Sequence, residues 1–267
     1  MRTLEKGKEL DPRGPNIPNN LKNLYQALRQ YEKCDQLCDE AIAAFPDGPG
    51  YFLAQKVETA HDRGDTKLAR TRLAAIPKEW DPSGYRSYLA IILALADRNY
   101  EEATQLFASL NRENVRSFLK TDLAILEALV ARKQGDEGRA RSILEKTREA
   151  NGKELEERPN ESVALTEVAE LDAHLGRKEE ALREAERAVE LRPISRDASA
   201  GPQFVYTLAK VCAVTGDHDR AIELLGQVAV VPAGPSYGQL LMPTWDELRG
   251  DPRFEKILAS LAPKSNK

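Results

Sequence analysis

The residue of this chain best suited to act as a nucleophile is Ser236, in a Gly-x-Ser-x-Gly pattern at positions 234 to 238. In serine hydrolases this pattern forms a turn between a strand and a helix, and a histidine follows later in the chain. The preceding Val-Ala-Val-Val is strand-like, but no histidine follows His218, and Pro235 fixes the backbone just before the serine. We interpret the segment as a loop, with a hydrolase that uses Ser236 as the second alternative for function.

Metal ligation is the other chemistry that the sequence could offer. Cys34 and Cys38 lie one helical turn apart, which would place two thiols on one helix face. No third or fourth ligand lies nearby, so we interpret both as packing residues, and Cys212 in the same way. The histidines lack metal-site spacing and are interpreted as capping or surface residues: His61, His174 and His218. The sequence therefore predicts no metal, no cofactor and no catalytic residue.

The bulk composition predicts which elements must position these side chains. Of the 267 residues, 31% are charged and 6% are aromatic, a mixture that favours long helices. The net charge of −4 and the lack of a basic patch argue against nucleic acid as a partner. The longest apolar run, residues 88–96, is too short to span a bilayer, and the N-terminus does not read as a secretory signal. The three cysteines are odd in number and lack the spacing of a disulfide framework, which favours a reducing compartment. Together these features predict a cytoplasmic protein without a membrane partner.

Small residues recur along the chain at intervals of 34 to 41 positions. A small side chain is needed where the two helices of a hairpin touch, because a larger one would separate their axes. Several of these positions follow a glycine that can end the preceding helix in a left-handed conformation: Gly64, Gly135, Gly176 and Gly216. The recurring small residues are Cys34, Ala69, Ala103, Ala140, Ala181 and Ala221.

This pattern resembles the tetratricopeptide repeat (TPR) over nearly the whole chain. The best unit runs from Glu161 to Pro193, with Gly176, Ala181 and Ala188 in the expected places. The resemblance implies an all-α fold, a right-handed superhelical solenoid of about six helix-turn-helix repeats with a C-terminal helical cap. We predict the tail of a preceding repeat helix over residues 1–13, the repeat array over 14–232, and the cap and tail over 233–267.

The C-terminal segment Pro-Thr-Trp-Asp-Glu-Leu-Arg-Gly-Asp-Pro-Arg-Phe-Glu-Lys-Ile-Leu is predicted to be that cap, because a stacked array ends on an apolar face. Asp251 and Pro252 begin a helix, and Trp245 and Leu248 form a short turn before it. The segment is similar to the ends of repeat arrays in bacterial multidomain signalling proteins, whose catalytic motifs are absent here. The predicted apolar stripe of the helix is Phe254, Ile257, Leu258 and Leu261.

The resemblance also implies where a partner binds, because the first helices of such repeats line the inner curve of the superhelix. It predicts a non-catalytic scaffold, a monomer or weak dimer, that holds a peptide or another protein in this groove as the partner-binding part of a larger signalling protein. The first alternative is a regulatory small-molecule sensor, and the tyrosines of the groove could instead pack between repeats. The predicted groove residues are Asn23, Tyr51, Gln55, Glu58, Tyr85, Tyr88, Asp122, Thr166, Tyr206 and Lys210, with Asn19 beside them.

Overall fold

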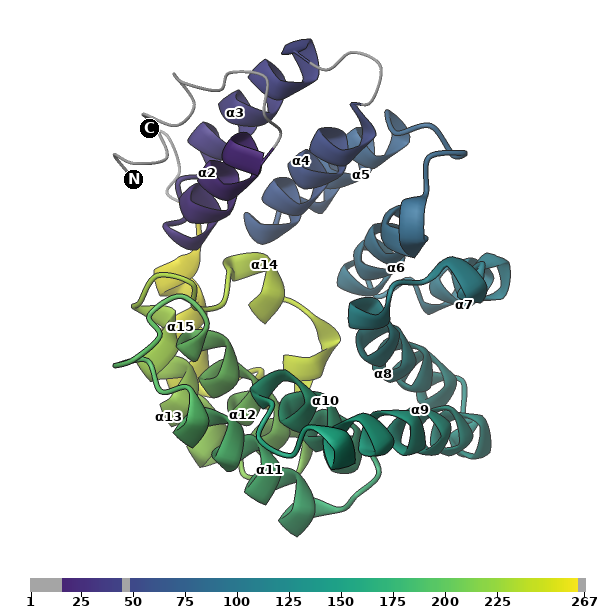
Figure 1. Ribbon diagram of the computed structural model, residues 1–267, viewed down its shortest axis with the longest axis vertical. Coiled ribbons are helices and arrows are strands. Elements are labelled where there is room, and N and C mark those ends of the chain that lie inside the picture. Colours follow the sequence, from purple (N-terminus) through teal and green to yellow (C-terminus); the bar gives the residue numbers. More distant parts are fainter. Residues whose placement is uncertain (1–15, 45–48, 264–267) are drawn as a thin grey trace.

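The computed structural model describes residues 16–44 and 49–263, and these residues form helices with no strand among them. The helices follow one another as hairpins, which confirms the predicted all-α solenoid of about six units (Figure 1). The predicted helix tail over residues 1–13 lies outside the described residues. The hairpins are α2 (Asn16–Ala27) with α3 (Tyr31–Ala44), α4 (Gly50–Asp62) with α5 (Thr66–Ala74), α6 (Tyr85–Ala96) with α7 (Tyr100–Ser109), α8 (Ser117–Lys133) with α9 (Glu137–Glu157), α10 (Ser162–His174) with α11 (Lys178–Leu191), and α12 (Gly201–Val214) with α13 (His218–Ala229).

Short helical elements complete the chain. Two single 3-10 turns, η1 (Pro82–Gly84) and η2 (Arg112–Asn114), lie in the connections before α6 and α8. After α13 come α14 (Tyr237–Leu240), η3 (Pro243–Leu248) and α15 (Pro252–Leu261). None of the described helices is both long and apolar enough to cross a membrane.

The recurring small residues lie where the sequence predicts them. Each belongs to the second helix of its hairpin and is fully buried, so the two helix axes can approach closely there: Cys34, Ala69, Ala103, Ala140, Ala181 and Ala221. Most second helices also start on a capping side chain. Asp65, Asn99, Asp136 and Asp217 each accept a hydrogen bond from a backbone N–H of the first turn.

The turn inside each hairpin contains a residue with positive φ, five positions before the small residue. In four hairpins this residue is glycine, with φ between 75° and 83°, as the sequence predicts: Gly64, Gly135, Gly176 and Gly216. In the first and third hairpins it is Arg29, with φ of 53°, and Arg98, with φ of 57°. A left-handed conformation costs a non-glycine residue about 1–2 kcal/mol. Contacts of the two arginine side chains explain why the chain tolerates this cost.

The C-terminal elements cover the apolar end of the last hairpin. Trp245 is fully buried, and its ring centroid lies 5.6 Å from that of Tyr206 and 6.4 Å from that of Phe254. Phe254 and Leu258 of α15 are buried in the same cluster, which also includes Leu225 of α13. Asp251 caps α15 by accepting a hydrogen bond from the N–H of Arg253. The predicted helical cap is therefore present.

The segment that leads into the cap also contacts the first hairpins, which the sequence analysis does not predict. The N–H of Ala233 donates to the carbonyl of Ala27 at 2.9 Å, and Arg29 donates to the carbonyls of Val231 and Pro235. The array thus curves back on itself into a ring, with α14 inside the curve next to α4 (Figure 1). The expectation that this segment only covers the last repeat is incomplete. We call residues 231–249 the closing segment.

Arg98, like Arg29, forms hydrogen bonds that hold the ring closed. Its guanidinium donates to the carbonyl of Leu241 at 3.0 Å and to the carboxylate of Asp246 at 2.5 Å, both in the closing segment. Arg29 and Arg98 therefore occupy the two turn positions that lack glycine, and both bind the same segment. A side chain at these positions supplies bonds across the ring that glycine could not make.

Candidate functional site

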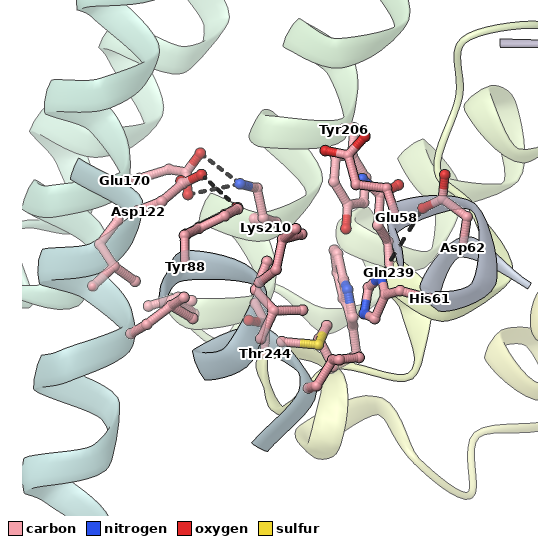
Figure 2. Close-up of a pocket in the computed structure, with 18 of the residues that line it drawn as sticks. Glu58, His61, Asp62, Tyr88, Asp122, Glu170, Tyr206, Lys210, Gln239 and Thr244 are labelled. Atoms are coloured by element: carbon pink, nitrogen blue, oxygen red, sulfur yellow. Dashed lines mark hydrogen bonds and ion pairs between the residues drawn. The ribbon is translucent and has the colours of Figure 1, made fainter. Parts of the chain in front are cut away.

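The inner surface of the ring encloses a cavity of about 250 Å³, which we call the central chamber. The residues of the array that line it all come from first helices of the hairpins, and the closing segment supplies the rest, among them Gln239, Met242 and Trp245. Figure 2 shows the chamber with side chains from these elements pointing into it. The inner groove is therefore not open along its whole length, because the chain itself walls its centre.

One side of the chamber contains three charged side chains and a tyrosine. Lys210 donates to both carboxylate oxygens of Glu170, at 2.6 Å and 2.7 Å, and its ammonium lies 5.5 Å from the ring centroid of Tyr206. The hydroxyl of Tyr88 donates to Asp122 at 3.2 Å. Attraction to Glu170 and Asp122 raises the pKa of Lys210 against the opposing effect of burial, so this lysine stays charged.

The other side contains Glu58, His61 and Asp62, all from α4 (Figure 2). Glu58 pairs with the ammonium of Lys22 at 3.1 Å and also accepts a hydrogen bond from Tyr85. His61 is only 8% exposed, and its Nδ1 lies 4.0 Å from a carboxylate oxygen of Asp62. Burial lowers the pKa of His61, so its imidazole is neutral.

Ser236 is held in a structural role. Its hydroxyl donates to the carboxylate of Asp62 at 2.9 Å and accepts from the N–H of Gln239, while the Gln239 side chain accepts from the N–H of Ser236. This reciprocal pair is a capping box that begins α14. The residues before it belong to α13 and a turn, so the strand of a nucleophile elbow is missing from this described segment. The geometry gives no support to a hydrolase based on Ser236.

Both glycines of the Gly-x-Ser-x-Gly pattern have a packing reason. A Cβ atom added to Gly234 would lie 1.8 Å from the carbonyl oxygen of Val228. One added to Gly238 would lie 1.7 Å from the carbonyl oxygen of His61. Glycine is needed at both positions because the closing segment packs closely against the backbone of α13 and α4.

We expect Ser236→Ala to lower the free energy of unfolding by about 1–3 kcal/mol, because it removes a helix cap and one of the hydrogen-bond donors to a buried carboxylate. Asp62 would keep only its bond from Gln26, at 2.6 Å. Urea denaturation followed by circular dichroism measures this change. The matched control is Ser109→Ala, an exposed serine whose hydroxyl bonds within its own helix. Equal stabilities of the two variants would contradict the structural role of Ser236.

A second cavity of about 380 Å³, which we call the outer cleft, lies along α4, α6 and the start of α8. Its rim holds two large side chains that are unusually exposed, Tyr51 at 40% and Phe118 at 57%. Trp80 and Arg116 also border the cleft. Glu58, Tyr88 and Asp122 line both cavities, so the acidic inner ends of the two are shared.

The predicted groove residues separate into distinct groups. Asn23 is exposed, and Thr166 is buried with its hydroxyl donating to the carbonyl of Val163 in its own helix, and neither lines the central chamber or the outer cleft. Tyr51, Gln55 and Tyr85 line the outer cleft, where the hydroxyl of Tyr51 donates to Asn19 at 2.6 Å. The residues placed at the central chamber are Glu58, Tyr88, Asp122, Tyr206 and Lys210.

Residues that the sequence analysis assigned to other roles also line the chamber. His61 and His174 border it, and His61 is only 8% exposed, so its interpretation as a capping or surface residue is wrong, whereas His174 is partly buried. Burial lowers the pKa of His174 to about 4. Asp62 and Glu170 had no motif that could single them out. The sequence offered one signal for three of these residues: His61, Glu170 and His174 lie in first helices, which line the inner surface of such an array.

The cysteines are buried packing residues, as their positions predict. Cys34 and Cys38 lie in α3 and Cys212 lies in α12, and all three are reduced. Burial raises the pKa of Cys34 to about 12 and that of Cys38 to about 11, so neither thiol ionises at neutral pH. In the described residues, no three or more histidine, cysteine or acidic side chains are grouped so that they could hold a metal ion.

No protein-family model and no curated protein matches the sequence. Among solved structures the chain is similar to YrrB, described as "a TPR protein with an unusual peptide-binding site", at 16% identity. The match covers 84% of this chain and 89% of YrrB, with a TM-score of 0.26. The buried small residues and the left-handed turns described above decide the fold. The chain is an all-α helical-repeat protein built from stacked hairpins.

Proposed function

We propose that the chain is a non-catalytic cytoplasmic scaffold that binds an extended peptide of another protein in the outer cleft. The single observation that carries this proposal is the pair of exposed rings at the rim, Tyr51 and Phe118, beside a cavity of about 380 Å³. Aromatic side chains left in solvent around a concave surface are typical anchors of protein interfaces. Because helix packing fixes the walls, binding would require little reorganisation.

The charges of the cleft indicate what kind of peptide fits. Its inner end contains the carboxylates of Glu58 and Asp122, whereas the exposed Arg116 lies at the border. A peptide with an apolar side chain against Phe118 and a basic residue directed towards the acidic end would match both features. The similarity of the C-terminal segment to arrays of bacterial signalling proteins supports a role as the partner-selecting part of such a protein.

The peptide proposal is tested by selecting binders from a displayed peptide library with the full chain. We expect enrichment of peptides that combine an apolar residue with lysine or arginine. Phe118→Ala and Tyr51→Ala should each weaken a selected peptide by about 1 kcal/mol or more, which is roughly five-fold. Fluorescence anisotropy with a labelled peptide measures this loss, and circular dichroism confirms that helicity is unchanged.

The control for these variants is Val230→Ala, which truncates an apolar residue that is 77% exposed and lines neither cavity. It should bind the peptide as the unaltered chain does. Equal binding by Phe118→Ala, Tyr51→Ala and Val230→Ala would place the peptide site outside the outer cleft.

A further inference from the structure

We propose that the central chamber binds a small aliphatic diamine, with one ammonium group at Asp122 and the other at His61 and Glu58. This site adjoins the proposed peptide cleft and shares Glu58 and Asp122 with it, whereas His61 lines only the chamber. The inference concerns a ligand class that the peptide function does not require.

The first observation is a carboxylate that has no ion-pair partner of its own among the side chains that the structure describes, although it lies in the field of Lys210, which is paired with Glu170. Asp122 lines the chamber and accepts a hydrogen bond from Tyr88, but among the described residues no cation lies within ion-pair distance of it. Among the residues that the structure describes, Lys210 is the only lysine or arginine that borders the chamber, and it is bonded to both oxygens of Glu170. An anion removed from bulk water is costly unless a cation accompanies it. An ammonium group on the ligand would supply this cation.

The second observation is independent and concerns His61, at the other side of the chamber. This side chain is more than nine-tenths buried, and its Nε2 atom has no hydrogen-bond partner in the described part of the chain. Its Nδ1 faces the carboxylate of Asp62, which favours the tautomer with the proton on Nδ1. Nε2 is then an acceptor that lacks a donor. An ammonium N–H is the complementary group.

The third observation is the placement of these groups on two sides of the chamber. Asp122 and Glu170 lie on one side of the chamber, and Glu58 and His61 lie on the opposite side (Figure 2). A ligand that reaches both sides therefore needs donors at each of its ends. Aliphatic side chains also line the chamber: Leu89, Ile92, Leu93, Ile125 and Leu126. A methylene chain suits these side chains, because it has no polar atoms that would lose hydrogen bonds with water.

The size of the chamber agrees with such a ligand. About 250 Å³ is several times the volume of one water molecule and lies just below the usual range for small-molecule sites. Its walls come from six first helices and from the closing segment, so a bound diamine would contact parts of the chain far apart in sequence. Such a ligand would stabilise the closed ring over an open one.

Isothermal titration calorimetry of the full chain with 1,4-diaminobutane at 0.15 M salt tests the proposal. We expect saturable binding of one diamine per chain. Binding of 1-butylamine should be at least about ten-fold weaker, because one ammonium contact is lost, and 1,4-butanediol should give no heat of binding. Asp122→Asn should weaken the diamine at least about ten-fold, whereas Asp122→Glu, which keeps the charge, should bind it more tightly than the asparagine variant.

The controls separate this site from the peptide cleft and from general charge effects. Asp219→Asn makes the same chemical change in a side chain that is 85% exposed and should bind the diamine normally. Phe118→Ala should also bind the diamine normally while binding the selected peptide more weakly. Absence of saturable binding, or equal diamine affinities of Asp122→Asn and Asp219→Asn, would overturn the diamine site and leave the peptide proposal standing. Loss of diamine binding in Phe118→Ala would also overturn it, because the ligand would then lie in the outer cleft.

Discussion

Trp245→Ala is expected to lower the free energy of unfolding by about 3–5 kcal/mol, the range for truncating a large aromatic side chain in a core. Trp245 is fully buried and packs against Tyr206 of the last hairpin and Phe254 of the cap. Its loss would leave a cavity between the array and the cap, so both sets of contacts would weaken together. Urea denaturation followed by circular dichroism measures the change.

The chain offers a matched control in its other tryptophan. Trp80 is only partly buried, at the edge of the cluster formed by α4, α5 and α6, and Trp80→Ala should cost less than about 2 kcal/mol. Hydrogen exchange would locate the difference, because amides of α12, α13 and α15 should lose protection in Trp245→Ala and keep it in Trp80→Ala. If Trp245→Ala unfolds at the urea concentration of the unaltered chain, residues 243–261 are a tail and not a cap.

The repeat was predictable because each of its positions obeys a local rule. A small residue such as Ala103 must lie where two adjacent helices touch, and a glycine such as Gly135 must end a helix in the left-handed conformation. The cap was predictable for a similar reason, since the stripe that begins at Phe254 has helical spacing and follows a capping aspartate. These features can be read from a few neighbouring residues.

The ring closure could not be predicted in this way, because the bonds that form it join residues far apart in the chain. Arg29 and Val231 are 202 positions apart, and Ser236 and Asp62 are 174 apart. From the sequence alone, an arginine at a turn position that glycine holds in other hairpins looks like a departure from the repeat pattern. Its role becomes visible only when the structure shows the distant residues that it binds. The same contacts explain why the groove prediction was incomplete. All of its residues lie on first helices, but the closing segment walls part of the groove as the central chamber, and other predicted residues lie at a second cavity, the outer cleft.

Gly238→Ala is expected to release the closing segment from α4 and open the ring. The added methyl group would lie 1.7 Å from the carbonyl oxygen and 2.7 Å from the carbonyl carbon of His61, so backbone atoms must move apart. Overpacking of this kind costs about 1–3 kcal/mol, which would make exchange of the amides held by closure about 10- to 100-fold faster. The N–H of Ala233 reports this directly, because it donates to the carbonyl of Ala27 across the ring.

Gly226→Ala is the control, since it makes the same change in α13 of the same chain. A Cβ atom there meets only the Cδ1 atom of Ile257, at 3.8 Å, and a helical alanine is about 0.5–1 kcal/mol more favourable than glycine. This variant should keep the ring closed and gain slight stability, whereas Gly238→Ala should also show a larger radius of gyration in small-angle X-ray scattering. Because the closing segment forms one wall of the central chamber, Gly238→Ala should bind 1,4-diaminobutane more weakly as well. Unchanged scattering and unchanged exchange at Ala233 would show that the close approach of Gly238 to α4 does not hold the ring together.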